Sequence, residues 1–249
     1  MNPFEKNYLN AVFIVVVLTG VILAYFIISL VRFHRRYVKL QKERIFAEIT
    51  IQEIERKRIA NDLHDSIGPV LSAVKLNINS IEINNEADQK IIDKTGKYLD
   101  DIIASMRQIS YNLLPNTLER KGLVEAVHEF IAQVNSKHVL DIHFMVLKDS
   151  RVSREKEIHI FRIIQEIMHN TIKHAGAKKL QIGISEEDGN FLLLTKDDGK
   201  GFDVQKEKLN FNGLGLKSLE SRSELLNGIL TLESQPGQGT NYFLKIPLS

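Results

Sequence analysis

The chain has 249 residues, of which 43% are hydrophobic and 26% are charged. This length and apolar content are enough for a folded core, which excludes wholesale disorder. The net charge is only +2, so the composition gives no sign of a basic nucleic-acid-binding protein, and we expect no direct contact with nucleic acid. The absence of cysteine excludes disulfides, cysteine-ligated metal sites and a thiol nucleophile.

An uncharged apolar block occupies residues 11–31 and is long enough to cross a bilayer as a helix. Basic residues dominate the segment that follows the block: Arg32, Arg35, Arg36, Lys39, Lys42 and Arg44. The positive-inside rule then places the C-terminal side in the cytoplasm and residues 1–10 outside as a short tail. A cleaved signal peptide and a buried core helix are the alternatives. A signal peptide is disfavoured because the basic residues follow the block and no clear cleavage site comes after it.

Residues 32–82 predict one long helix whose sequence is interrupted only at Gly68-Pro69. Apolar side chains recur there at steps of three and four, with Asn77 as the polar interruption: Ala60, Leu63, Ile67, Val70, Val74 and Ile81. This spacing is typical of a helix–helix seam. Between residues 38 and 56 the seam is weaker, because Gln52 and Arg56 fall at seam positions. Residues 32–55 are the predicted connector between the apolar block and the hairpin.

A second seamed helix is predicted over residues 88–113, with Asp88 as its cap. Two such helices joined by a short turn predict an antiparallel hairpin over residues 56–115. We expect a homodimer, because a four-helix bundle would cover both seams. The alternative is a monomer in which the hairpin packs on the next domain.

Beyond Pro115 the pattern changes to that of a mixed α/β domain, residues 116–249, with helices against one face of a sheet. The predicted elements are a helix at 122–134, a strand at 141–147, a helix at 154–175, strands at 179–185 and 191–196, a glycine-rich loop at 197–212, a helix at 213–226, and strands at 229–234 and 240–247.

His64 is the first candidate for chemistry. It directly follows the seam residue Leu63, so we expect it on the shoulder of the hairpin, where solvent can reach it. A neutral imidazole is a competent nucleophile near pH 7. Asp65 could hold one ring nitrogen, but neighbours at i and i+1 do not face each other on a helix, so the spacing does not establish the contact. A solvated surface histidine without function remains the alternative from position alone.

A polar face on the helix predicted at 154–175 is the second candidate. Glu166, Asn170 and His174 recur every four residues, and Lys173 lies beside them. Carboxylate and amide oxygens followed by a cation suit Mg²⁺ and a triphosphate. An amphipathic helix with a solvated face is the alternative. His169 and His174 are poorly spaced to share one metal.

Two glycine motifs follow the strand at 191–196. In Asp197-Asp198-Gly199-Lys200-Gly201-Phe202, a carboxylate at a strand end can accept a hydrogen bond from an exocyclic amine, and the glycines allow close backbone approach to a ligand. Asn212-Gly213-Leu214-Gly215-Leu216 opens a predicted helix, an arrangement suited to phosphate. The chain has no GxxxxGK[ST] motif, which excludes a P-loop.

The order of these motifs resembles that of sensor histidine kinases, in the subfamily that pairs with LuxR-type helix-turn-helix response regulators. The resemblance covers residues 53–249. ERKRIANDLHDSIG resembles the phosphoacceptor box, QEIMHNTIKHAGA the N box, DDGKGF the first glycine box, GLGLKSLESRSELLNG the second, and PGQGTNYFLKIP the closing strand pair. It implies a dimeric phosphotransfer hairpin followed by an ATP-binding α/β sandwich of the Bergerat (GHKL) type. With the apolar block at residues 11–31, the predicted fold is a membrane-anchored α plus α/β protein.

The resemblance also implies roles for individual residues. His64 would be phosphorylated and Asp65 would assist it. Asn170 would hold Mg²⁺, and Glu166 would polarise the water around the ion. The remaining roles concern ATP: Lys173 and His174 at the phosphates, Asp197 at the adenine amine, Gly199 and Gly201 beside the base, Gly213 and Gly215 on the phosphate side, Thr240 closing the adenine pocket, and residues 203–212 as a mobile lid.

The chain departs from this pattern at Pro69, where many members of the subfamily carry a glutamine implicated in dephosphorylating the regulator. The proline removes a helical hydrogen bond to the Asp65 carbonyl and predicts a kink just beyond His64. The resemblance therefore supports kinase activity and leaves phosphatase activity doubtful.

Two functions other than a kinase remain as alternatives: a non-catalytic nucleotide-binding membrane adaptor, and a GHKL ATPase or Ser/Thr kinase of the anti-sigma type. The intact His64 and Asp65 and the hairpin count against both. The short outer tail predicts that any signal arrives from the bilayer, a partner membrane protein or the connector.

Overall fold

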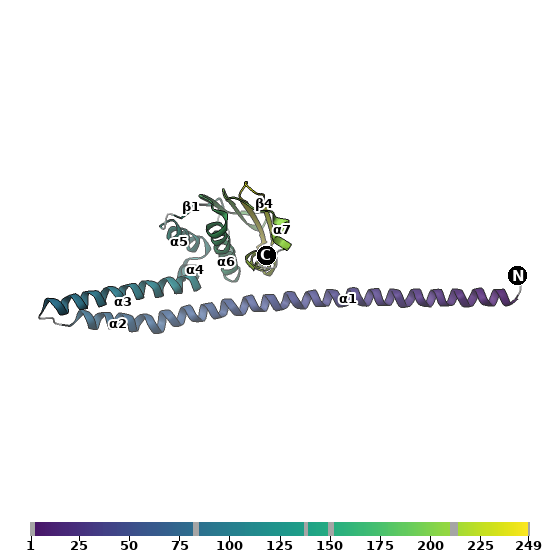
Figure 1. The fold of residues 1–249 in the computed structure, drawn as a ribbon, viewed down its shortest axis with the longest axis horizontal. Coiled ribbons are helices and arrows are strands. Elements are labelled where there is room, and N and C mark those ends of the chain that lie inside the picture. The colour runs from purple at the N-terminus through teal and green to yellow at the C-terminus, as the bar shows by residue number, and fades with distance from the viewer. Residues whose placement is uncertain (1–2, 82–84, 137–138, 149–151, 210–213, 249) are drawn as a thin grey trace. The chain divides into compact units, whose positions relative to one another are not determined.

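The computed structural model describes residues 3–81, 85–136, 139–148, 152–209 and 214–248, except for the side chains of 3, 5–12, 15, 208, 209 and 214. The chain divides into two compact units, Met1–Glu48 and Ile49–Ser249. The first is helical throughout its described residues, and the second joins a helical hairpin to an α/β sandwich (Figure 1).

The helix α1, Pro3–Asp62, runs without a break through the apolar block and the connector, which were predicted as two separate segments. It is the one helix in the described residues that is long and apolar enough to cross a membrane. Its large apolar side chains face outward: Leu23, Phe26 and Ile27 are each more than half exposed. Such a surface is costly in water and favourable in hydrocarbon, in keeping with the predicted membrane span.

Pro69 changes the helix where the sequence predicts a kink. A π-helical segment, Leu63–Ile67, lies between α1 and α2, Gly68–Asn79. The N–H of Gly68 donates to the carbonyl of Leu63, five residues earlier. A proline cannot donate the next helical hydrogen bond, so the chain takes up the wider π turn before it.

The returning helix of the hairpin is α3, Glu86–Leu113, and the predicted cap at Asp88 is wrong. The cap is Asn85, whose side-chain oxygen accepts the N–H of Asp88 at 2.8 Å. Asparagine is among the best N-cap residues, and it places Asp88 in the first turn, where a negative charge is favourable.

The two hairpin helices meet along only part of their predicted seams. Ala60 and Leu99 are buried, and the Ser110 hydroxyl donates to the carbonyl of Ala60 at 3.3 Å. The outer part of the seam is exposed: Val70, Val74, Ile102 and Ile109 are each at least 40% exposed. A single chain therefore leaves much of the predicted seam uncovered.

The α/β part begins with α4, Asn116–Lys121, and α5, Leu123–Asn135. Its other elements are β1, Asp141–Val146; α6, Arg154–Asn170, with a π-helical extension, Thr171–Ala175; β2, Lys179–Glu187; β3, Asn190–Asp197; α7, Val204–Leu209; α8, Leu214–Leu225; β4, Ile229–Ser234; and β5, Thr240–Pro247. The strand order is β1-β2-β3-β5-β4, with β1 parallel to β2 and the other pairs antiparallel. The predicted strands and long helices of this domain are confirmed.

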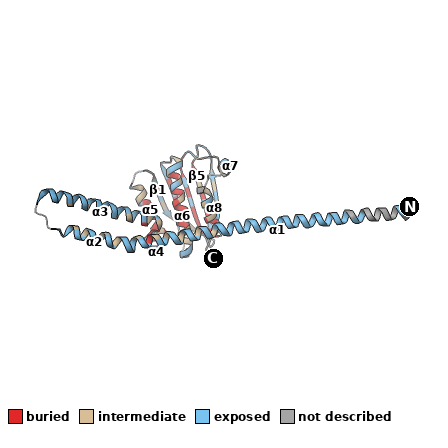
Figure 2. Ribbon diagram, turned by 60° about the horizontal axis from the view of Figure 1, so that its bottom comes forward, coloured by how far each residue is buried: buried red, intermediate tan, exposed pale blue. Residues whose placement is uncertain are grey.

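The core lies between the sheet and the helices that cover one of its faces (Figure 2). Ile160, Ile163 and Ile164 of α6 are fully buried, as are the inward residues Ile182 and Leu193 of the central strands. The period-two burial along the strands follows from this one-sided cover. α6 is thus held firmly on the sheet, with its C-terminal end at the edge where the glycine motifs lie.

The predicted glycine-rich loop at 197–212 contains a helix, α7, which the sequence analysis missed. The carboxylate of Asp203 accepts the N–H groups of Gln205 and Lys206 at 3.0 and 3.2 Å. An aspartate that caps the first turn is enough to start a short helix between the glycines.

Candidate active site

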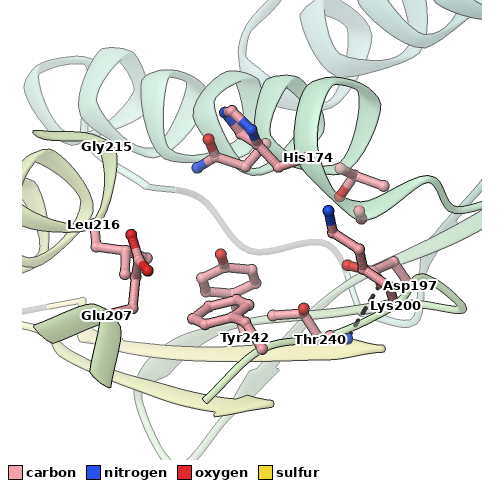
Figure 3. Close-up of a pocket in the computed structure, with 13 residues that line it drawn as sticks. His174, Asp197, Lys200, Glu207, Gly215, Leu216, Thr240 and Tyr242 are labelled. Carbon is pink, nitrogen blue, oxygen red and sulfur yellow. Dashed lines mark hydrogen bonds between the residues drawn. The ribbon is translucent and has the colours of Figure 1, made fainter. Parts of the chain in front are cut away.

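A cavity of about 450 Å³ opens between the end of α6 and the ends of β3 and β5, with α7 and α8 on its other side (Figure 3). Its lining comprises Asn170, Thr171, His174, Ala175, Asp197, Lys200, Gly201, Phe202, Glu207, Gly215, Leu216, Thr240 and Tyr242. The volume is in the range of small-molecule sites. Residues from four separate sequence motifs therefore share one cavity.

Asp197 is the last residue of β3, and only 3% of it is exposed. Its Oδ1 accepts the N–H groups of Gly199 at 2.8 Å and Thr240 at 3.2 Å, and the Thr171 hydroxyl also donates to its side chain. Burial raises the pKa of this carboxyl above its ordinary value, although the backbone donors oppose the shift. A buried carboxylate held by donors on one side can accept a ligand N–H on the other.

The two glycines of the Asp197 motif are required for different structural reasons. A Cβ on Gly199 would lie 2.6 Å from the Cβ of Ala175, so this glycine lets the loop pack on α6 and lies outside the cavity lining. Gly201 lines the cavity, has φ +58°, and would place a Cβ 2.0 Å from the carbonyl oxygen of Gln235. Any side chain at either position would push apart the elements that form the cavity wall.

Glu166, Asn170 and Gly215 converge at the start of α8. A Cβ on Gly215 would lie 2.5 Å from Glu166 Oε1 and 3.5 Å from both side-chain amide atoms of Asn170. Asn170 and Gly215 line the cavity, whereas Glu166 lies behind them and is not in the lining. Gly213 lies outside the described residues.

The two predicted phosphate contacts on the α6 extension differ in position. His174 lines the cavity and is labelled in Figure 3, whereas Lys173 is exposed and is not part of the lining. Within the described ranges, no group of three or more His, Asp or Glu could hold a metal ion. A Mg²⁺ ion here would rest on one or two side-chain oxygens and the substrate's phosphates, as is usual for this ion.

Sequence reasoning missed several lining residues, among them Thr171, Phe202 and Tyr242. Tyr242 follows Thr240 by two residues on β5, so strand alternation could have placed both on the cavity side. Tyr242 is 5% exposed, and burial raises the pKa of its hydroxyl. The fold also brings in Lys200 from the glycine motif and Glu207 from α7, although the sequence assigned neither side chain a role.

His64 lies in the π-helical segment of the hairpin, apart from the residues that line the cavity. Its side chain is 67% exposed, and its Nδ1 is 2.8 Å from Asp65 Oδ1. Adjacent side chains on an α-helix do not face each other, so the sequence could not establish this contact. The structure makes the contact within the π turn that precedes Pro69.

Two family models match separate parts of the chain. Residues 55–118 match a model described as histidine kinase, and residues 155–249 match one described as histidine kinase-, DNA gyrase B-, and HSP90-like ATPase. The first covers the hairpin with His64, and the second covers the cavity.

Two curated relatives agree with these matches. The sensor histidine kinase LiaS of Bacillus subtilis is 30% identical over 198 residues, covering 78% of this chain and 54% of that protein. The signal transduction histidine-protein kinase/phosphatase DegS of Brevibacillus brevis is 29% identical, over 81% of this chain and 53% of that protein. The blue-light activated histidine kinase EL346 of Erythrobacter litoralis gives a TM-score of 0.48 at 16% identity, over 84% of this chain and 60% of that one.

The chain spans about half the length of the curated relatives it matches. In this chain the histidine kinase model at residues 55–118 precedes the ATPase model at residues 155–249. On this evidence the chain belongs to the histidine kinases, in the subfamily with this type of phosphoacceptor hairpin.

Proposed function

We propose that this chain is a membrane-bound sensor kinase that transfers the γ-phosphoryl group of ATP to His64 and then to an aspartate of a separate response regulator. The observation that carries the proposal is the exposed His64–Asp65 pair, on a hairpin followed by an ATPase-type cavity. The names of the relatives support the same assignment.

The geometry at His64 suits a nucleophile. With the proton on Nδ1 donated to Asp65, Nε2 keeps its lone pair and has no hydrogen-bond partner among the residues that the structure describes. Nε2 attacks the γ-phosphorus of ATP, the bond to the bridging oxygen breaks, and ADP leaves. The Nδ1 proton stays on the ring or passes to Asp65. A carboxylate of the regulator then takes the phosphoryl group from Nε2.

The cavity residues fit ATP by their chemistry. Asp197 would accept the adenine amine, with Gly201 and Thr240 beside the base, and the apolar faces of Phe202 and Tyr242 would cover it. His174 and Gly215 would meet the phosphates. Lys173 would reach them only from the solvent side. We propose residues 203–212, including α7, as the lid; residues 210–212 lie outside the described residues.

Asn170 and Glu166 fit a hard cation, since both offer oxygens at the phosphate end of the cavity. Mg²⁺ bound there would neutralise negative charge on the phosphoryl group during its transfer. In this proposal Asn170 orients the ion and Glu166 holds its water, while the main chain at Gly215 is free to approach the phosphates.

We further propose a single-pass anchor at residues 11–31, a connector at 32–55, a dimerising hairpin at 56–115 and an ATP-binding domain at 116–249. The regulator would carry a LuxR-type output domain. One relative is named a kinase/phosphatase. Because Pro69 stands where many members carry glutamine, we propose that phosphatase activity is weak in this chain.

The test is autophosphorylation of the full chain in lipid nanodiscs with labelled ATP and Mg²⁺. Acid-labile, base-stable label is expected in the wild type and none in His64→Gln, which should bind nucleotide within a few-fold of the wild type. Asn170→Asp or EDTA should abolish labelling. His143→Gln is the matched control, because His143 pairs with Asp141 at 3.1 Å and is similarly exposed, but it lies on β1.

Three outcomes would contradict the proposal. Acid-labile label that persists in His64→Gln would mean that another residue is phosphorylated. Nucleotide binding without any label in the wild type would support the adaptor function instead. Normal labelling in EDTA would remove the metal from the mechanism.

A further inference from the structure

A buried cluster of charges joins the connector helix to the ATP-binding domain. Glu53 of α1 is 10% exposed, and its two carboxylate oxygens face two different arginines. Oε2 accepts from Nε of Arg162 at 3.0 Å, and Oε1 lies 2.9 Å from Nη2 of Arg222. The arginine side chains are only 4% and 6% exposed, so this is an ion-pair cluster within the protein and not a surface contact.

Arg162 also binds the end of the second hairpin helix. Its Nη1 donates to the carbonyl of Asn112 at 3.1 Å, and its Nη2 donates to the carbonyl of Leu113. These are the last carbonyls of α3, which the helix itself leaves without partners. One side chain of α6 therefore ties the ATP-binding domain both to the connector part of α1 and to the end of α3.

The charges of the cluster come from different parts of the chain. Arg162 is on α6 and Arg222 is on α8, both in the ATP-binding domain, whereas the shared carboxylate comes from the connector. Burial lowers the pKa of both arginines, Glu53 opposes the shift, and Arg56 adds to it. If α1 turned Glu53 away, two buried guanidinium groups would lie together without their carboxylate, which is a strongly unfavourable state.

Glu53 lies about three helical turns, or roughly 16 Å, before His64 on the same helix. With the cluster formed, the His64 side chain is 67% exposed, and its described partner is Asp65, from the hairpin itself. The docked arrangement thus holds the ATP-binding domain at the base of the hairpin and leaves the phosphoacceptor uncovered. None of the described hydrogen bonds or ion pairs of His64 joins it to a residue that lines the cavity, so we expect transfer to His64 of the same chain to require a movement of the domain.

We infer that Glu53 is the residue through which the connector controls the kinase: paired with Arg162 and Arg222, it clamps the ATP-binding domain in a resting position, and a rotation of α1 that withdraws its carboxylate releases the domain for transfer. This inference rests on the proposed kinase function. It adds a specific clamp, formed by a connector residue that lies outside the phosphoacceptor hairpin and the ATP cavity.

The first test replaces Glu53 by the isosteric neutral glutamine in the full chain in nanodiscs. Glu53→Gln should raise the initial rate of autophosphorylation at least fivefold, with nucleotide affinity within threefold of the wild type. Glu55→Gln is the matched control, because Glu55 pairs only with Arg58 among its described contacts on the same helix. Its rate should stay within twofold. A Glu53→Gln rate equal to or below that of the wild type, with nucleotide still bound, would overturn the clamp.

A reversible cross-link tests the same clamp without relying on a destabilised variant. The natural chain has no cysteine, so Glu53→Cys with Arg222→Cys can be joined by a short bis-methanethiosulfonate reagent and freed by dithiothreitol. The joined protein should label at least tenfold more slowly than the freed one, while both bind nucleotide. Equal labelling would overturn the inference. A wild type that never labels would instead contradict the proposed function, so the two failures are distinguishable.

Discussion

The buried carboxylate of Asp197 is expected to bind a ligand but to lower the stability of the folded state. Its side chain is almost fully buried, and burial raises its pKa above the ordinary value of 3.8. The folded state therefore binds the proton more tightly than the unfolded chain does. Between the ordinary and the raised pKa, the free energy of unfolding falls as the pH rises, so the ionised group costs stability at neutral pH.

We expect Asp197→Asn to stabilise the nucleotide-free protein while removing ATP binding. Asparagine keeps an oxygen for the N–H groups of Gly199 and Thr240 but carries no charge to desolvate. The free energy of unfolding should rise by about 1 kcal/mol at pH 7, as is typical when a residue needed for function but not for stability is replaced. This increase should shrink as the pH is lowered through the raised pKa of Asp197, because the carboxyl then becomes neutral itself.

Thermal unfolding with and without ATP checks this prediction, and Asp198→Asn is the control. Asp198 accepts the N–H groups of Lys178 and Lys179 at 2.8 and 2.9 Å and is not in the cavity lining. The control should keep the rise in melting temperature that ATP causes. An Asp197→Asn protein that ATP still stabilises as it does the wild type would contradict the adenine role.

Among the elements, the π-helical segment Leu63–Ile67 has the clearest link to chemistry. It carries both His64 and Asp65, and it ends at Gly68, directly before Pro69. The missing N–H of the proline removes one α-helical hydrogen bond, and the wider turn replaces it. The proline thus shapes the backbone on which the histidine and its carboxylate meet.

We expect Pro69→Ala to return this segment to a regular α-helix and to separate His64 from Asp65, because adjacent residues on an α-helix do not face each other. Autophosphorylation should fall about a hundredfold, at the lower end of what a positioned acid or base contributes, with nucleotide affinity unchanged. The measurement is the initial labelling rate of the full chain.

Gly68→Ala is the control for this substitution. A Cβ at Gly68 would meet Met106 Cε at 3.7 Å, an ordinary contact, and the proline and the π turn remain. Its labelling rate should stay near that of the wild type. If Pro69→Ala labels as fast as Gly68→Ala, the π turn is not needed for the reaction.

At the scale of the whole molecule, the exposed seam of the hairpin predicts a second copy. Val70 is 60% exposed and Ile102 is 52% exposed, although both fall on the three-and-four spacing of a helix interface. A dimer would cover these faces and those of the partner's hairpin. The predicted homodimer therefore explains why apolar seam residues of a single chain are exposed to water.

We expect Val70→Asp to weaken the dimer at least a hundredfold, about 2.8 kcal/mol, because both copies would bury a carboxylate in the seam. Concentration-dependent energy transfer between labelled copies in detergent micelles measures the dissociation constant. Leu76→Asp is the control, since Leu76 is 70% exposed but lies off the seam spacing. Equal dissociation constants for the two variants would contradict the seam as the dimer interface.

Periodicity and local motifs in the sequence were enough to predict the long elements of this protein. The three-and-four spacing predicts the hairpin, and alternation predicts all five strands, because burial of one face imposes these periods on the residues themselves. The glycine motifs and Asn170 could be placed near one cavity because their chemistry is local to a turn or a helix end. The apolar block likewise predicts its own helix.

Only the tertiary structure decides which distant groups meet. The contact of Glu53 with Arg162 and Arg222 joins three helices far apart in the chain, and no local pattern marks it. Lys200, Glu207 and Tyr242 enter the cavity because strands and loops converge there. The His64–Asp65 contact depends on a π turn that the spacing did not predict. Long-range pairing depends on how the elements pack, and their sequence periods record only which face is buried.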